Sequence, residues 1–413
     1  MDLFILFIFL FFLSKQNGLS IASAIIGIYI ISLVVMFFLS PSVFMCFNLG
    51  IFDLLYLSIF YALLVLPWRY MKISSPVDLQ ISNGDLRLYS IYKKLGFFCL
   101  IINLVIFIVL QSVVTDYSAF KNESETVDYL KYIPIPHILS LFVSWFSRSY
   151  LFILPFHFFF LKENNVKEAI ITLVLSGNYI LVGLAGFSRS STVSYFIIYS
   201  ILLLYFHKSI DKSTILKYSK YFIIAVVGLS TAFYGITMNR FAGEKEYVVN
   251  AFIHQDGLIS DPLLNSQASY LSQWYAKTVK WLPQYSTTEL TYGVRSLPLL
   301  FFILQKIGLS NANDLFLINI EKQFGSSDAG AFMGVCTNLI FDIGFLFTFM
   351  FALLYNKIVK KRATSNSSSI LSFLPIVILL EIPATGIFSS CMNGMGWHVS
   401  LMLYFIYRNI FKK

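Results

Sequence analysis

The sequence predicts an all-α fold, a polytopic integral membrane protein with about 11 transmembrane helices and one long periplasmic loop. Hydrophobic residues make up 57% of the 413-residue chain and charged residues only 12%, whereas a soluble domain carries about a quarter. Long apolar runs recur along the chain, and Lys and Arg collect on alternate connections between them. Both patterns indicate a chain that folds in lipid.

Polar linkers separate the apolar segments, and a break at Ser188–Ser190 divides the sixth from the seventh. A helix needs about 20 apolar residues to cross a bilayer, and most of the segments approach that length. In order, the expected spans are Leu3–Leu13, Leu19–Leu39, Val43–Leu66, Leu95–Val114, Ile138–Phe160, Glu168–Phe187, Ser191–Phe206, Tyr221–Thr237, Phe332–Ile358, Ile370–Phe388 and Met395–Phe411. We therefore expect eight helices in 1–237, the long loop in 238–331 and three helices in 332–413.

The distribution of basic residues predicts the orientation, because short cytoplasmic loops carry the excess of Lys and Arg. Every basic cluster falls on an alternate connection when the N-terminus is periplasmic and the C-terminus cytoplasmic. The clusters are Lys15; Arg69, Lys72, Arg87, Lys93 and Lys94; Lys162 and Lys167; Lys208, Lys212, Lys217 and Lys220; Lys357, Lys360, Lys361 and Arg362; and Arg408, Lys412 and Lys413. This pattern predicts a multi-pass membrane protein with an outward N-terminus and a cytoplasmic C-terminus.

The polar stretch from Met238 to Ala331 is the first functional candidate, since structureless connections of that length are uncommon unless they have a role. Its apolar run Leu297–Leu304 is too short to span and predicts an interfacial helix, with a re-entrant segment as the alternative. This stretch also contains several aromatic side chains: Trp274, Trp281, Tyr285 and Tyr292.

Signatures of soluble enzymes are missing from the sequence. We find no phosphate-binding glycine loop, dinucleotide fingerprint, paired-histidine metal motif or nucleophile elbow, so neither a cofactor nor a metal is expected. The net charge of +9 is spread over short clusters between apolar runs, which argues against a nucleic-acid partner.

Ionisable residues within the expected spans are costly to place there and are functional candidates by default. They are Asp53, Arg148, Arg189, Asp342 and Glu381. Arg148 lies nearly half way along its segment, where it either pairs with Asp342 or Glu381 or contacts a substrate. Asp53 is nearer the outer end of its segment and can reach interfacial water.

Three arginines at the expected outer surface are candidates to bind phosphate, because a guanidinium holds two phosphate oxygens at once. Arg189 lies in the turn Gly186–Ser191, Arg240 directly follows the eighth span, and Arg295 lies in the long loop. The alternatives are a snorkelling Arg189 and ordinary solvated charges at the other two positions.

Three residues are candidates for a general base at the same surface. His398 opens the last span beside Trp397, where a hydrogen-bonded interfacial histidine is the alternative. His254 and Asp256 lie in the long loop.

The chain resembles the Wzy-type polymerases of O-antigen and related polysaccharide repeat units. The resemblance covers most of the chain and is carried by the number of spans, the long outer loop, the Gly-x-Ser-Arg turn ending at Arg189, and the run Thr337-Asn338-x-x-x-Asp342-x-Gly344. Some relatives have a second glycine after the Ser-Arg pair, where this chain has Ser190.

The resemblance implies a glycosyltransferase whose substrates are oligosaccharides linked to undecaprenyl diphosphate in the outer leaflet. Membrane lipids surround such an enzyme, and a chain-length regulator protein is a candidate partner. Arg189, Arg240, Arg295 and Arg148 are then expected to bind substrate, and His398, His254 or Asp256 to act as base. The aromatic candidates to stack on sugar rings are Trp274, Trp281, Tyr285 and Tyr292. An O-antigen ligase and a flippase or other transporter are the rival functions, and a non-catalytic membrane scaffold is a further alternative.

Overall fold

The computed structural model describes residues 1–15, 18–45, 49–113, 135–185, 190–242, 258–259, 262–287, 290–308, 333–365, 368–388 and 391–410. Every named element in these ranges is a helix, and the only extended pairings there are two isolated bridges, so the predicted all-α fold is confirmed. The chain divides into two compact units. The first contains Met1–Pro76, Lys245–Ser365 and Leu379–Met395, and the second contains Val77–Glu244, Asn366–Ile378 and Gly396–Lys413.

All eleven expected segments coincide with helices, but not all of these helices are long enough to cross a membrane. In the described chain six helices are both long and apolar enough, and a seventh is gained if the bent pair Ile138–Ser147 and Tyr150–Lys162 forms one span. The number of eleven spans is therefore not confirmed. The first helix, for example, has 14 residues and the last has 16.

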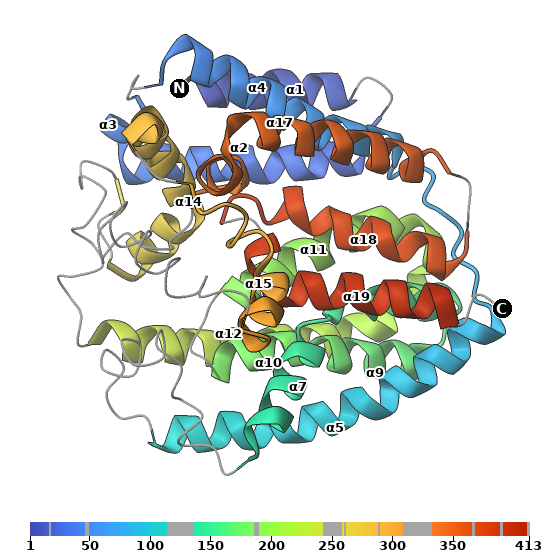
Figure 1. Cartoon of the computed structure of the whole chain (residues 1–413). Coiled ribbons are helices and arrows are strands. Elements are labelled where there is room, and N and C mark those ends of the chain that lie inside the picture. Colours follow the sequence, from blue (N-terminus) through green and yellow to red (C-terminus); the bar gives the residue numbers. More distant parts are fainter. Residues whose placement is uncertain are drawn as a thin grey trace. The chain divides into compact units, whose positions relative to one another are not determined.

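The first unit is built around four apolar helices of the N-terminal and C-terminal parts of the chain (Figure 1). Helix α1 (Asp2–Lys15) packs on α2 (Ile21–Leu39), and α4 (Ile51–Val65) packs on α17 (Val335–Ala363). The short elements α3 (Pro41–Phe44) and η1 (Leu66–Tyr70) flank α4. Rings from three of these elements, Phe7, Tyr29 and Tyr61, meet with centroids 4.8–5.4 Å apart and form the centre of the core.

The long segment expected as a loop contributes helices to this unit. It contains α14 (Pro262–Trp281), η5 (Leu282–Thr287) and α15 (Pro298–Lys306), and α15 confirms the short helix expected at Leu297–Leu304. Helix α14 packs along α2, and its Trp274 is 0% exposed with the indole N–H donating to Ser32 Oγ at 2.6 Å. The segment is therefore joined to the membrane helices by a buried aromatic anchor.

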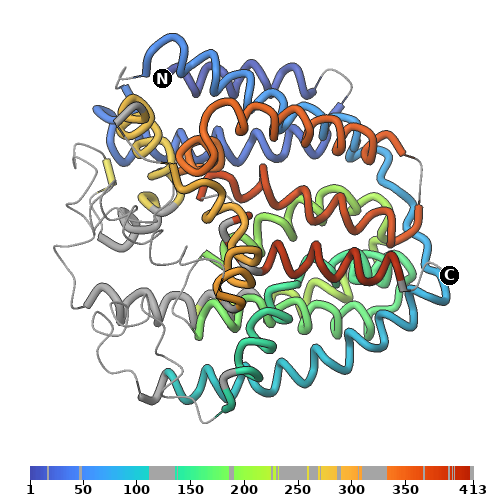
Figure 2. Tube along the Cα trace, viewed as in Figure 1, coloured from blue at the N-terminus to red at the C-terminus, as the bar shows by residue number. Residues whose placement is uncertain are grey.

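Helix α17 is interrupted at Gly344, whose φ of 82° and ψ of 167° lie outside the helical region. Only glycine adopts such a conformation without a large steric cost. Figure 2 shows α17 (orange) changing direction near its start. The Tyr56 hydroxyl donates to the Phe345 carbonyl oxygen at 2.6 Å, so this carbonyl group next to the interruption has a hydrogen-bond partner on α4. The interruption separates a short first part of α17 from a long apolar second part.

The second unit is organised around α5 (Asn83–Val113), which packs on α7 (His137–Ser147), α9 (Val166–Ser176) and α10 (Asn178–Ala185). The remaining elements are η3 (Tyr150–Phe152), α8 (Leu154–Lys162), α11 (Ser190–Phe206), η4 (His207–Ser209) and α12 (Lys212–Ala242). Helix α18 (Ile370–Ala384) belongs to this unit as far as Ile378, and α19 (Met395–Ile410) belongs to it from Gly396 onward.

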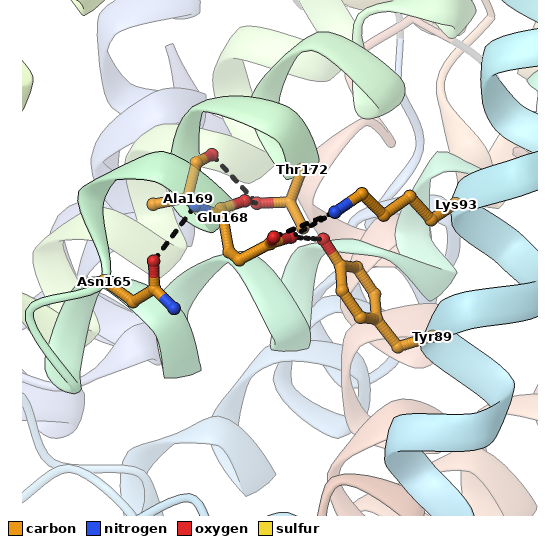
Figure 3. Close-up of polar contacts among 6 residues, drawn as sticks. All are labelled: Tyr89, Lys93, Asn165, Glu168, Ala169 and Thr172. Atoms are coloured by element: carbon orange, nitrogen blue, oxygen red, sulfur yellow. Dashed lines mark hydrogen bonds and ion pairs between the residues drawn. The ribbon is translucent and has the colours of Figure 1, made fainter.

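A charged cluster joins α5 to α9 near their predicted cytoplasmic ends (Figure 3). The Glu168 carboxylate accepts from Lys93 Nζ at 2.8 Å on both oxygens and from the Tyr89 hydroxyl at 2.5 Å. Asn165 caps α9 by accepting from the Glu168 amide at 3.2 Å. The side chains of Lys93 and Glu168 are 29% and 23% exposed, so solvent screens this pair less than it screens a fully exposed ion pair.

Candidate functional site

A concentrated polar arrangement surrounds the carboxylate of Asp342, in the first part of α17. Asp342 is 0% exposed. Its Oδ1 accepts from the Thr291 hydroxyl and from the amides of Gly293 at 3.1 Å and Arg295 at 3.3 Å, and its Oδ2 accepts from the Ser296 amide at 2.8 Å. Four donors of one loop segment therefore converge on a single buried carboxylate, which we call the Asp342 cradle.

The local backbone explains how these amides can point at one carboxylate. Tyr292 and Gly293 have φ values of 50° and 88°, so two consecutive residues adopt the left-handed region. Tyr292 pays a steric cost there that glycine avoids, and such conformations persist only where surrounding contacts hold them. The Gly293 amide contacts the Asp342 carbonyl as well, at 3.3 Å. The cradle therefore holds the segment from Thr291 to Ser296 in a turn that it would not adopt alone.

Arg295 is the charged side chain that the cradle positions. It is 6% exposed, and burial lowers the pKa of its guanidinium from 12.5 to about 10, although the charge of Asp342 acts in the opposite direction. A group with this pKa stays protonated at neutral pH. The structure thus places a permanent cation in the segment between α14 and α17.

A second set of contacts fixes α14 to the beginning of α17. The Thr278 hydroxyl lies 2.9 Å from the Thr337 hydroxyl and donates to the Met333 carbonyl at 3.1 Å. The Asn338 amide group donates to the Gly334 carbonyl at 2.9 Å. The short sequence run Thr337-Asn338-x-x-x-Asp342-x-Gly344 therefore has a structural basis: each named residue shapes α17 or attaches the preceding segment to it.

The four aromatic residues considered for sugar stacking have different environments. Trp274 is in the core and is not available to a ligand. Trp281 and Tyr285 are partly buried against Met333 and Phe341. Tyr292 is 79% exposed, and its backbone is fixed by the cradle three residues before Arg295. Tyr292 is thus the most exposed member of this set.

Several predicted site residues lie outside the described residues: Arg189, His254 and Asp256. Arg240, expected just after the eighth span, falls in the last turn of α12, which continues to Ala242. Asp53 has a structural role, because its Oδ2 accepts from the Gly50 amide at 3.2 Å and caps the start of α4. Glu381 is 5% exposed on α18.

Arg148 does not lie inside a continuous helix, as its position in the expected span Ile138–Phe160 suggested. It is the C-cap residue of α7, at the break where Ile138–Ser147 and Tyr150–Lys162 meet at 44°. Its suggested ion-pair partners, Asp342 and Glu381, belong to the other unit.

His398, which is 9% exposed on α19, belongs to the same unit as Arg148. Its ring lies edge-on to Trp397, with centroids 5.2 Å apart.

Two buried basic residues were missed by the sequence analysis. Lys277 on α14 is 2% exposed, directly before the Thr278 that contacts Thr337. His157 on α8 is 0% exposed, and its ring nitrogens lie 2.9 Å from the Ala169 carbonyl oxygen and 3.0 Å from the Tyr199 hydroxyl oxygen. The sequence could have identified Lys277 as a charged residue within an amphipathic stretch. It could have identified His157 as an ionisable residue inside the expected span Ile138–Phe160.

The fold defines a polytopic helical membrane protein with an ordered polar segment attached to its membrane helices. No protein-family model, curated protein or solved structure matches the chain.

Proposed function

We propose that this chain is a polymerase of oligosaccharide repeat units carried on undecaprenyl diphosphate, a glycosyltransferase acting at the outer face of a bacterial inner membrane. The observation that supports this function best is the Asp342 cradle. It fixes Arg295, a buried cation, in the one long segment between membrane helices, and it does so through the carboxylate of the run Thr337–Gly344.

The reaction needs such a cation. The acceptor hydroxyl attacks the anomeric carbon of the donor sugar while the bond from that carbon to the diphosphate oxygen breaks. The lipid diphosphate leaves with the electron pair, and the hydroxyl proton passes to a base. Charge accumulates on the leaving oxygen, where a fixed guanidinium is worth far more than a mobile one, because it needs no reorganisation during the reaction.

Positioning by the cradle fits this role. The backbone of the turn is hydrogen-bonded to the Asp342 carboxylate, so the Cα of Arg295 is held in a fixed position. The neighbouring exposed ring of Tyr292 can contact a sugar attached to the same diphosphate. His398 remains the described candidate for the base, together with His254 and Asp256 outside the described residues.

An O-antigen ligase would use the same donor and the same cation, so the two functions differ in the acceptor. Deleting the gene tests both. Loss of a polymerase leaves surface lipopolysaccharide that carries at most one repeat unit, whereas loss of a ligase leaves no repeat unit attached to the core. A core-only phenotype would contradict the polymerase.

A flippase or other transporter is the second candidate, and the bent span at Arg148 is the observation that favours it. Transporters often bind substrates at discontinuous helices. Transport of lipid-linked units into vesicles by the purified protein, without any elongation, would support this rival over the polymerase.

A further inference from the structure

We propose that η1 and the end of α17 form a binding site for the headgroup of an anionic phospholipid of the phosphatidylglycerol type. The site lies within the first unit and is independent of the proposed polymerase reaction. It depends on three observations: a group of cations without ion-pair partners, a fixed junction that brings two of these cations to one phenol ring, and an exposed apolar stripe that leads to the same place.

Basic residues gather where two helices that are long and apolar enough to cross a membrane, Ile51–Tyr70 and Val335–Ala363, come to an end. They are Arg69, Lys72, Lys357, Lys360, Lys361 and Arg362, which we call the η1–α17 cluster. The surrounding stretches 66–76 and 357–365 contain no Asp or Glu. Within the described part of the chain, no member of the cluster forms an ion pair. The positive charge at this end of the unit is therefore not neutralised by a carboxylate there.

Buried hydrogen bonds fix η1 against α17. Trp68 is fully buried, and its indole N–H donates to the Tyr355 hydroxyl at 3.0 Å. The Tyr355 hydroxyl in turn donates to the Leu379 carbonyl oxygen at 3.0 Å. One turn away, the Asn356 side chain donates to the Leu63 carbonyl oxygen at 2.8 Å. The cations on the two elements are thus carried by backbones that are held together.

Tyr70 is the point at which cations of both elements meet. Its ring is exposed, with the guanidinium carbon of Arg69 5.3 Å and the Nζ of Lys360 5.9 Å from the ring centroid. Arg69 Nη2 also donates to the Tyr70 hydroxyl at 3.3 Å. Two like charges this close repel one another, and an anion bound between them would turn that repulsion into attraction. A guanidinium beside an ammonium is a combination that binds phosphate, the first with two parallel donors and the second as a point charge.

An apolar stripe on α17 leads to these cations. Residues three or four positions apart lie on one face of a helix. The exposed apolar residues of this face are Met350, Leu353, Leu354 and Ile358. Lys357 and Lys361 continue it at the same spacing, and both are exposed. The face therefore changes from apolar to cationic toward the end of the helix.

The three observations together select an amphiphilic anion. A free phosphate would use the cations alone, and an acidic protein would leave the apolar stripe uncovered. The acyl chains of a phospholipid can lie along the stripe while its phosphate reaches Arg69 and Lys360. Basic groups at the end of a membrane helix attract anionic headgroups in this way. Phosphatidylglycerol fits because its headgroup has no amine to offset the phosphate charge, whereas phosphatidylcholine carries one.

Titration of the purified full-length protein in detergent, with bound lipid counted by native mass spectrometry, tests the site. Dioleoyl phosphatidylglycerol is the probe, with dioleoyl phosphatidylcholine and glycerol 3-phosphate in parallel. We expect phosphatidylglycerol to bind more tightly than either. Arg69→Gln combined with Lys360→Gln should weaken its binding roughly thirtyfold, because each Lys or Arg near an anionic headgroup contributes about fivefold.

The matched control is Lys212→Gln combined with Lys217→Gln, which removes two exposed charges from α12 in the other unit. This protein should bind phosphatidylglycerol as the wild type does. Thermal unfolding without lipid should be the same for all three proteins, since every substituted side chain is exposed.

Several results would overturn the proposal. Unchanged affinity after loss of Arg69 and Lys360 would show that the headgroup binds elsewhere, and an equal loss in the control would show an effect of net charge alone. Equal binding of phosphatidylcholine would remove the role of the cations, and equal binding of glycerol 3-phosphate would remove that of the apolar stripe. Tighter binding of poly-glutamate than of phosphatidylglycerol would assign the surface to an acidic protein instead.

Discussion

The carboxylate of Asp342 accepts a hydrogen bond from the amide of Ser296 at 2.8 Å, although the two residues are 46 positions apart in the chain. This bond and its neighbours attach the turn that carries Arg295 to a membrane helix. The proposed chemistry depends on that attachment, because a cation on a mobile loop would lose much of its effect on the leaving group.

The first prediction concerns Asp342. Asp342→Asn keeps the size of the side chain but removes the charge and turns one acceptor into a donor. Hydrogen bonds to a charged group are worth about 1.5–3 kcal/mol each, so the turn should detach and chain length should fall sharply. A polysaccharide gel read beside a membrane immunoblot measures both activity and abundance. Asp53→Asn, at a carboxylate that caps α4 with one bond, should leave the ladder intact; a full ladder from Asp342→Asn would contradict the role of the cradle.

The second prediction concerns the interruption of α17. Gly344→Ala places a Cβ at a φ of 82° and a ψ of 167°, a region that essentially only glycine occupies, and 3.2 Å from the Tyr285 hydroxyl, so we expect a loss of about 1–3 kcal/mol in stability. Thermal unfolding of the purified protein measures it. Gly228→Ala is the matched control, because nothing lies within 4 Å of a Cβ there, and alanine is the better helix former. Equal melting temperatures for the two variants would show that the break is not fixed.

The third prediction distinguishes an aromatic residue of the core, Trp274, from one proposed to contact the substrate, Tyr292. Trp274→Ala should cost about 3–5 kcal/mol and reduce membrane abundance, because a fully buried ring is lost. Tyr292→Ala should shorten the polymer at normal abundance, while Tyr292→Phe should retain the ring and full length. If Tyr292→Ala makes normal chains, the sugar does not stack on this residue.

The helices could be predicted from sequence, because apolar length is a local property that the bilayer imposes. The short helix at Leu297–Leu304 was predicted for the same reason. The breaks could not be predicted: neither Gly344 nor the pair Arg148–Ser149 differs from ordinary sequence until the surrounding contacts are known. The Asp342 cradle joins residues that are 46 to 51 positions apart, and the periodicity of hydrophobic residues does not predict contacts over such separations.

The fourth prediction concerns pH. Burial lowers the pKa of Arg295 to about 10, below its unfolded value of 12.5. The folded state therefore disfavours the charged form. Between about pH 10 and 12.5 the folded protein has lost this proton while the unfolded chain still holds it, so the free energy of unfolding rises with pH there. Below about pH 9 the group stays charged, so its contribution to activity should be constant from about pH 6 to 9. Rates of wild type and Arg295→Gln, whose new side chain does not titrate, should keep a constant ratio across this range; a ratio that changes with pH would contradict a permanently charged Arg295.

A fifth prediction concerns orientation. Reporter fusions after Lys212 and Arg362 should give a cytoplasmic signal, and a fusion near Asp261 should give a periplasmic one. A cytoplasmic signal at Asp261 would separate the Arg295 segment from an outer-leaflet substrate.

The most direct test of the central claim is the polysaccharide ladder of Arg295 variants at matched membrane abundance. If the guanidinium stabilises the departing diphosphate, Arg295→Lys should lower the rate roughly ten- to a hundredfold, since lysine loses the bidentate geometry, and Arg295→Ala should lower it further. Both should leave short chains of repeat units. Full-length ladders from both variants at normal abundance would contradict the claim that Arg295 takes part in the reaction.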